Sequence, residues 1–174
     1  MPRGLYRFHH SGSSHFITFT CYHRYQHLAA TSVRDLFVKA LERTRLLYDM
    51  RVYGFVVMTE HVHLLISEPR QGTVATAIQS LKISSAKRAR QAQPGRGSEA
   101  PFWQKRYFDR KVWGKELIEK LKYIHRNPVR RGLVQNPEDW AWSSFRHYAS
   151  GENCGVVIES WRSRTYTLPP IIAN

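Results

Sequence analysis

The 174-residue chain has few cysteines, few acidic residues and no long apolar run. Its two cysteines, Cys21 and Cys154, lie far apart without a Cys-x-x-Cys pattern, which argues against a disulfide framework or a zinc knuckle. No run of about 18 apolar residues exists to cross a membrane, and the opening residues lack the apolar core of a signal peptide. We therefore expect a cytoplasmic protein without a membrane partner.

The shortage of acids leaves a strong positive charge, because 27 Lys and Arg face only 13 Asp and Glu, for a formal net charge of +14. The excess is concentrated between Lys82 and Arg131, a stretch with 15 Lys and Arg and 4 Asp and Glu. A basic field of this strength attracts polyanions. Nucleic acid is the partner that the composition favours.

The length suits one domain with a substantial core. We expect a single domain over residues 1–150 and a tail over residues 151–174 that packs on this domain or extends from it. Alternating β-branched and aromatic residues predict strands, and apolar residues at three- and four-residue spacing predict helices. The predicted strands are His15–Tyr22, Val52–Met58 and Val62–Ser67, and a short strand pair or extended arm follows at Phe102–Trp113.

Helices are predicted from Thr31, as N-cap, to Met50, from Val74 to Gln91, from Lys115 to Asn127 with Pro128 as its stop, and within Trp140–Ala149. The order strand, helix, strand, strand, helix predicts an α+β fold. We expect an antiparallel sheet of the ferredoxin-like or RRM-like kind, with helices on one side and C-terminal helical additions.

Two histidines separated by one residue, His61 and His63, stand at the start of a predicted strand. Side chains alternate across a strand, so both imidazoles project from one face and could grip one divalent ion. Alone, the triplet is weak evidence, because two exposed strand histidines without a function would show the same pattern.

In the helix predicted after Lys115, Tyr123 points away from the apolar face formed by Leu117, Leu121 and Ile124. Asn127 lies one turn further along, where its amide oxygen could ligate a metal that the Tyr123 hydroxyl also approaches. Each residue alone also has a plain structural interpretation, as a half-exposed tyrosine and a helix-terminating asparagine.

Two motifs together are more specific: Met58-Thr-Glu-His-Val-His-Leu-Leu-Ile66 and Tyr123-Ile-His-Arg-Asn-Pro-Val129. In this order and spacing they resemble the REP-associated tyrosine transposases, which belong to the HUH (His-hydrophobic-His) single-strand transposases. The likeness covers most of the chain, including Phe102–Asp109 and Trp142–Tyr148. The sequence departs from that family at Thr59-Glu60, where a Pro-Asn pair commonly precedes the first histidine. The resemblance therefore does not determine the conformation of this turn or the charge beside the metal.

The resemblance implies that His61, His63 and Asn127 bind Mg²⁺ or Mn²⁺ and that Tyr123 is the nucleophile. It further implies an enzyme that cleaves and rejoins single-stranded DNA through a covalent 5′-phosphotyrosine, with hairpin (REP-like) DNA as the substrate. The phenol needs help to ionise, and we expect it from Lys120 or Arg126. Tyr107, in the basic segment Arg106-Tyr-Phe-Asp109, is the rival nucleophile.

The basic residues that we expect to contact DNA phosphates are Lys82, Lys87, Arg88, Arg90, Lys105, Arg106, Arg110, Lys111, Arg130 and Arg131. Trp103, Tyr107 and Phe108 are expected to stack on unpaired bases.

Two other functions fit part of the pattern: a non-catalytic single-stranded nucleic-acid-binding module of RRM-like fold, which needs neither metal nor tyrosine, and a replication or plasmid-transfer nickase. A monomer is favoured over a homodimer, since one chain holds every residue of the set.

Overall fold

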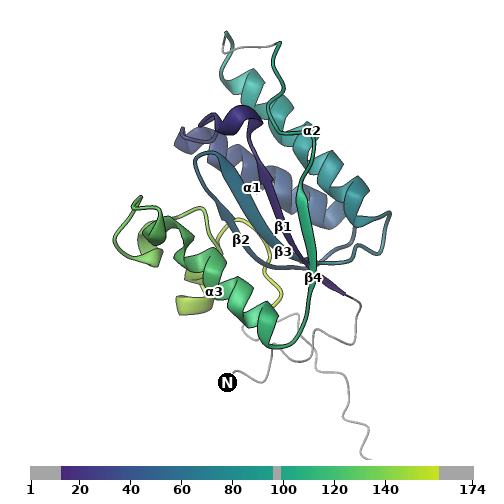
Figure 1. Ribbon diagram of the computed structural model, residues 1–174, viewed down its shortest axis with the longest axis vertical. Coiled ribbons are helices and arrows are strands. Elements are labelled where there is room, and N and C mark those ends of the chain that lie inside the picture. The colour runs from purple at the N-terminus through teal and green to yellow at the C-terminus, as the bar shows by residue number, and fades with distance from the viewer. Residues whose placement is uncertain (1–12, 96–98, 161–174) are drawn as a thin grey trace, which may run out of the picture.

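The computed structural model describes residues 13–95 and 99–160. Their centre is a four-stranded antiparallel sheet in the order β2-β3-β1-β4 (Figure 1). The strands are β1 (Ser14–Thr20), β2 (Val52–Val57), β3 (His61–Ser67) and β4 (Phe108–Val112). The longer helices are α1 (Thr31–Leu47), α2 (Val74–Ala92) and α3 (Lys115–Arg130), and α4 (Phe145–Ser150) is short. Single 3₁₀ turns follow β1 and α3, at Tyr22–Arg24 and Pro137–Asp139.

The element order β1-α1-β2-β3-α2-β4, with β1 and β3 in the middle of the sheet, is the ferredoxin-like arrangement, so the predicted fold class is confirmed. Helices α1 and α2 pack together over one face. The C-terminal addition α3 covers part of the other face, against β2 and β3. Strands β2 and β3 are therefore buried on both sides, whereas β4 is largely exposed.

Strand β3 shows why both faces are apolar. Val62, Leu64 and Ile66 point into the core beneath α1 and α2, while Leu65 joins the second core beneath α3. Alternation then places His61 and His63 on the α3 face. Every residue of β3 is buried, which fits a central strand with helices on both sides.

Two local predictions need correction, and the structure decides a third that the sequence leaves open. The third helix does not stop before Pro128 but runs through it to Arg130, because a proline in the last turn removes only one backbone hydrogen bond. Thr31 is the first helical residue rather than the N-cap, a position held by Ala30 without a side-chain cap. The segment Phe102–Trp113, for which a short strand pair or an extended arm was expected, contains one strand, β4, which pairs with β1.

Part of the predicted tail is built into the domain. Ile158 forms a parallel bridge with Val52 at the edge of the sheet, and Val156 and Ile158 are buried in the first core. Residues 151–160 therefore pack on the domain, while residues 161–174 lie outside the described residues. Among the helices described, none is long and apolar enough to cross a membrane.

Candidate active site

A pocket of about 670 Å³ opens between α3 and the part of the sheet that α3 leaves uncovered. Three segments supply most of its lining. Strand β1 contributes Phe16, Thr18 and Thr20, β3 contributes His61 and His63, and α3 contributes Lys120, Tyr123, Asn127 and Arg130. Arg24, Phe108 and Arg131 complete the lining. The register brings the first two groups together, because Thr18 pairs with His63 and Thr20 with His61. The predicted metal ligands and nucleophile thus share one pocket.

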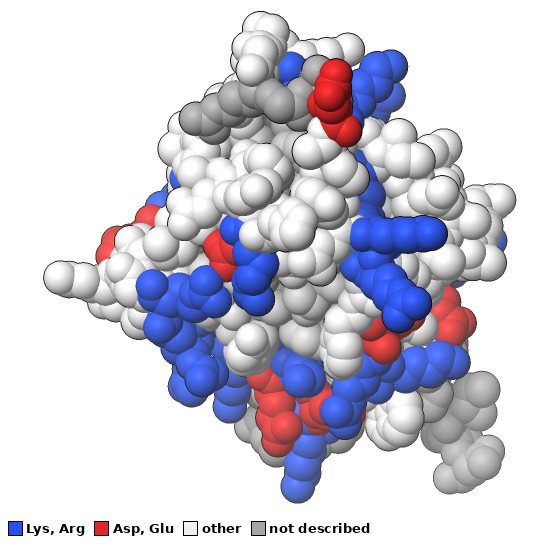
Figure 2. All heavy atoms as spheres, turned by 45° about the horizontal axis from the view of Figure 1, so that its top comes forward, with Lys and Arg blue, Asp and Glu red and all other residues white. Residues whose placement is uncertain are grey.

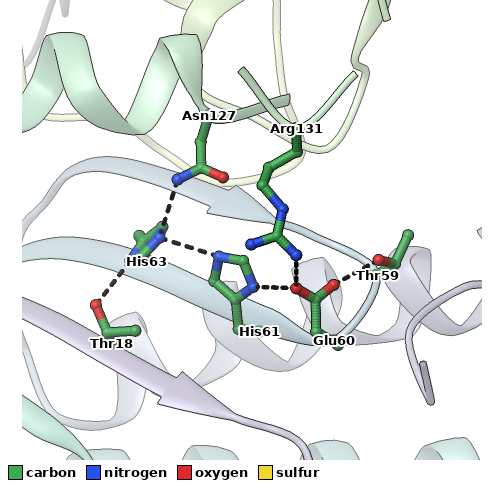
Figure 3. A network of polar contacts seen from close by, with 7 residues as sticks. All are labelled: Thr18, Thr59, Glu60, His61, His63, Asn127 and Arg131. Atoms are coloured by element: carbon green, nitrogen blue, oxygen red, sulfur yellow. Dashed lines mark hydrogen bonds and ion pairs between the residues drawn. The ribbon is translucent and has the colours of Figure 1, made fainter. Parts of the chain in front are cut away.

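The two histidines face each other. His61 Nε2 lies 3.1 Å from His63 Nε2, and both side chains are about 95% buried (Figure 3). The far nitrogen of each ring has its own partner: His61 Nδ1 lies 2.9 Å from Glu60 Oε1, and His63 Nδ1 lies 2.7 Å from Thr18 Oγ1. Phe16 stacks on the His63 ring with a centroid distance of 5.4 Å. Both rings are therefore held with Nε2 directed into the site.

Burial keeps both imidazoles neutral at physiological pH. It lowers the pKa of His63 to about 3, helped by the neighbouring His61 ring and by the positive charges of Lys120 and Arg131. It also lowers the pKa of His61, although the Glu60 carboxylate works in the opposite direction. A neutral imidazole offers a lone pair, which is the form that binds a metal.

Asn127 completes the constellation from α3. Its Nδ2 lies 3.2 Å from His63 Nε2, while its Oδ1 is buried without a hydrogen-bond partner. A buried acceptor without a partner is costly. If the amide turns over, so that Oδ1 rather than Nδ2 faces His63, this oxygen and the two Nε2 atoms form a donor set that fits a divalent metal. No group of three His, Cys, Asp or Glu in the described part of the chain could hold a metal, so this site depends on the amide.

Tyr123 lies beside His63 at the mouth of the pocket. Its ring packs edge-on against His63 at 5.2 Å and against Phe16 at 6.0 Å between centroids, and 37% of the side chain is exposed. The Lys120 ammonium and the Arg130 guanidinium each lie 5.8 Å from the Tyr123 ring centroid. Lys120 is therefore placed as expected, whereas Arg126 does not line the pocket and Arg130 takes the second position.

The rival tyrosine belongs to a different part of the molecule. Tyr107 packs against the core beneath α1 and α2, on the opposite side of the sheet from the histidines. It lines a separate groove of about 810 Å³ between α2 and the segment Pro101–Lys105. Burial and the nearby Asp109 carboxylate raise the pKa of its hydroxyl, which disfavours ionisation. The placement favours Tyr123.

Six of the ten predicted phosphate contacts line one of two separate hollows. Arg130 and Arg131 line the active-site pocket, whereas Lys82, Lys87, Arg90 and Lys105 line the α2 groove. Several have partners within the protein: Lys82 and Arg90 donate to backbone carbonyl oxygens, and Arg110, Lys111 and Arg131 pair with glutamates. Lys87, Lys105 and Arg106 are exposed, and Arg88 is half-buried. Figure 2 shows that Lys and Arg outnumber Asp and Glu on the face presented.

Trp103 corrects one expectation. Only 6% of its side chain is exposed, its indole N–H donates to Ser85 Oγ at 3.2 Å, and its ring packs edge-on against Phe19. The ring is part of the core and offers no free face for an unpaired base. Phe108, by contrast, is 52% exposed and lines the active-site pocket, as a stacking residue requires.

Sequence reasoning missed four residues that line this pocket, Phe16, Thr18, Thr20 and Arg24, and it also missed the contacts that Glu60 makes behind His61. Strand alternation carries a signal for the first three, because they share one face of β1. Their position beside the histidines depends on the register between β1 and β3, which cannot be read from the sequence.

The comparisons with known proteins agree with this geometry. The family model described as "Transposase IS200 like" matches residues 9–127, which include His61, His63, Tyr123 and Asn127.

The chain belongs to the IS200-like transposase family.

One relative is a Haemophilus influenzae protein named as a REP-associated tyrosine transposase. It is 29% identical to this chain over 133 residues, which are 72% of this chain and 74% of the relative. A solved REP-associated tyrosine transposase, bound to a REP hairpin, matches with a TM-score of 0.65 and 22% identity over 85% of this chain and 87% of its own. A transposase structure from Deinococcus radiodurans matches with a TM-score of 0.51 and 22% identity, over 64% and 87% respectively. The resemblance and the fold expected from the sequence are confirmed.

Proposed function

We propose that this IS200-like transposase is a metal-dependent enzyme that cleaves and rejoins single-stranded DNA through a covalent 5′-phosphotyrosine at Tyr123. The observation that carries the proposal is that Tyr123 lies beside a pair of neutral, inward-facing imidazoles and an unpartnered amide oxygen in one open pocket. The site provides a nucleophile and a set of metal donors, which phosphoryl transfer requires.

In the proposed step, the Tyr123 oxygen forms a bond to phosphorus and the bond from phosphorus to the 3′ oxygen breaks. The phenol proton is released to solvent, and the departing 3′ oxygen takes up a proton to become a hydroxyl. The new ester preserves the phosphodiester, so the reverse attack by a 3′-OH rejoins DNA without a nucleotide cofactor. Lys120 and Arg130, beside the Tyr123 ring, stabilise negative charge on the phenol oxygen and on the phosphate.

His61, His63 and Asn127 would hold Mg²⁺ or Mn²⁺, and imidazole donors favour Mn²⁺ of the two. When bound, the ion supplies Lewis-acid neutralisation of a non-bridging phosphate oxygen. The chain's own contribution is to keep both Nε2 atoms directed inward, because Glu60 holds the His61 ring and Thr18 holds the His63 ring.

The proposed substrate is a DNA hairpin with a single-stranded flank. Two features support it: the exposed cations Lys87, Lys105 and Arg106 are suited to phosphates, and a relative of the same fold is bound to a REP hairpin. The exposed Phe108 ring stands at the pocket mouth, where it could stack on an unpaired base beside the scissile phosphate. We further propose that the protein acts as a monomer, because every residue of the set lies in one chain.

The alternative of a non-catalytic RRM-like module gains no support from the structure. Such a module binds bases on an open sheet face with exposed aromatic side chains. Here α3 covers β2 and β3, and Phe16 is buried, with 4% of its side chain exposed.

The test is to incubate 5′-labelled and 3′-labelled hairpin oligonucleotides with the protein and Mn²⁺ and to look for a covalent adduct in denaturing gels. We expect a covalent adduct with the 3′-labelled oligonucleotide, because the protein stays attached to the fragment on the 3′ side of the cut. The adduct should be absent in Tyr123→Phe and after treatment with a chelator. Tyr107→Phe is the matched control and should retain the adduct. Loss of the adduct in Tyr107→Phe with retention in Tyr123→Phe would overturn the assignment.

A further inference from the structure

Glu60 is a buried carboxylate next to the first histidine of the pair. Only 4% of the residue is exposed, and it lies in the turn between β2 and β3. A buried charge is tolerated only when its oxygens are satisfied. Both oxygens of Glu60 have partners, so its position is built into the site rather than incidental.

The partners come from three directions, as Figure 3 shows. His61 Nδ1 lies 2.9 Å and Arg131 Nη2 2.6 Å from Oε1, while Thr59 Oγ1 donates to Oε2 at 2.5 Å. Arginine keeps its positive charge in proteins, so the contact between the Arg131 guanidinium and Oε1 is an ion pair in which Glu60 is the anion. A carboxylate anion accepts a hydrogen bond at each of these contacts.

This fixes the tautomer of His61. A carboxylate can only accept, so the neutral imidazole must carry its hydrogen on Nδ1, and the lone pair must stand on Nε2, which faces His63. Without Glu60, either nitrogen of the ring could carry the hydrogen.

We propose that Glu60 is a positioning residue for His61: it holds the Nε2 lone pair toward the metal site, and Thr59 and Arg131 hold Glu60 in place. The inference rests on the proposed function, because it assigns His61 to a metal. A carboxylate behind a ligating histidine also makes that ligand more basic and sets the plane of its ring. The Thr59-Glu60 departure from the family's Pro-Asn pair then provides a charged support for the same ring.

The proposal also changes the role of Arg131. We expected this residue to bind DNA phosphate, yet its guanidinium lies 2.6 Å from the carboxylate that supports His61. The side chain is 49% exposed, so it remains open to solvent while it holds Glu60. Arg130 pairs with no carboxylate among the described residues and lies over Tyr123, so it is the better phosphate contact of the two.

The first test needs no metal. Long-range ¹H–¹⁵N NMR of the chelator-treated protein reports which nitrogen of each histidine carries the hydrogen. We expect His61 to be the Nδ1–H tautomer in the wild type and in Glu116→Ala, a matched control that removes a carboxylate paired with Arg110 away from the pocket. In Glu60→Ala the His61 signals should shift toward the other tautomer. An unchanged His61 tautomer in Glu60→Ala would overturn the proposal.

The second test measures Mn²⁺ affinity by calorimetry. Loss of the partner behind a metal ligand typically weakens affinity by about 10–100-fold, and we expect Glu60→Ala to fall in this range. Glu60→Gln keeps an acceptor for His61 and should lose less, which also supplies a result if the alanine variant fails to fold. His61→Ala separates the two claims. If it binds Mn²⁺ as the wild type does, the proposed metal site is wrong; if it loses Mn²⁺ while both Glu60 variants keep wild-type affinity, only the role of Glu60 is wrong.

Discussion

Gly54 offers a test of how the fold positions the nucleophile, because it lies in β2 directly beneath α3. A Cβ atom added to Gly54 would stand 2.5 Å from Leu121 Cδ1 and 3.3 Å from Ser144 Oγ, both closer than ordinary contact. Leu121 is 94% buried and lies two residues before Tyr123 on α3. Gly54→Ala must therefore move the Leu121 side chain or the helix that carries Tyr123 and Asn127.

The expected cost is about 1–3 kcal/mol of unfolding free energy, the usual range for one added methyl group in a packed core. With a urea m-value of roughly 2 kcal/mol/M, this lowers the unfolding midpoint by about 0.5–1.5 M. Misplacement of α3 by a fraction of an ångström should slow adduct formation by about tenfold. Hairpin affinity should change little, since the exposed cations of α2 do not touch α3.

A double-mutant cycle with Leu121→Val identifies the cause. The shorter valine makes room for the new methyl group, so the double variant should cost at least about 0.5 kcal/mol less than the sum of the single variants. The measurements are urea unfolding followed by circular dichroism and single-turnover adduct formation. Additive costs, or a Gly54→Ala protein with wild-type stability and rate, would refute the argument.

Three further predictions follow from the burial of particular side chains. Burial lowers the pKa of His63 and of His125 to about 3, so below pH 6.5 the unfolded chain takes up protons that the folded chain does not. The free energy of unfolding should therefore fall below pH 6.5 by about 1.4 kcal/mol per pH unit for each histidine. A urea midpoint that stays constant between pH 7 and pH 5 would contradict this. Trp103→Ala should lower the free energy of unfolding by about 3–5 kcal/mol in urea, because the indole is buried. Phe108→Ala should leave stability unchanged and weaken the binding of single-stranded DNA in a fluorescence assay. If instead Trp103→Ala weakens binding and leaves stability unchanged, Trp103 is a stacking residue after all. Lys87→Ala should reduce the slope of log affinity against log salt by about one, and an unchanged slope would remove Lys87 from the DNA interface.

The sequence was most informative where a side-chain period was regular. Alternation along β3 placed His61 and His63 on one face, and the helical period turned Tyr123 away from the apolar stripe of α3. Both are local properties of one element. The two-residue and 3.6-residue repeats determine them before any tertiary contact forms.

Features that depend on distant contacts could not be predicted in the same way. Aromatic and basic residues alternate around Trp103, which suggested a stacking platform, but Ser85 and Phe19 from other elements bury its indole. The sequence left the role of the Glu60 charge undecided, because its ion-pair partner Arg131 lies 71 residues later in the chain. Tertiary packing determined both outcomes.

The central claim is that Tyr123 attacks DNA phosphorus, and identification of the residue that carries the DNA tests it most directly. The covalent adduct formed with a hairpin oligonucleotide and Mn²⁺ would be digested with trypsin and nuclease and sequenced by tandem mass spectrometry. The account predicts a nucleotide remnant on Tyr123 in the peptide Tyr123–Arg126. A remnant on Tyr107 or on any other residue, or purified protein that forms no adduct, would contradict it.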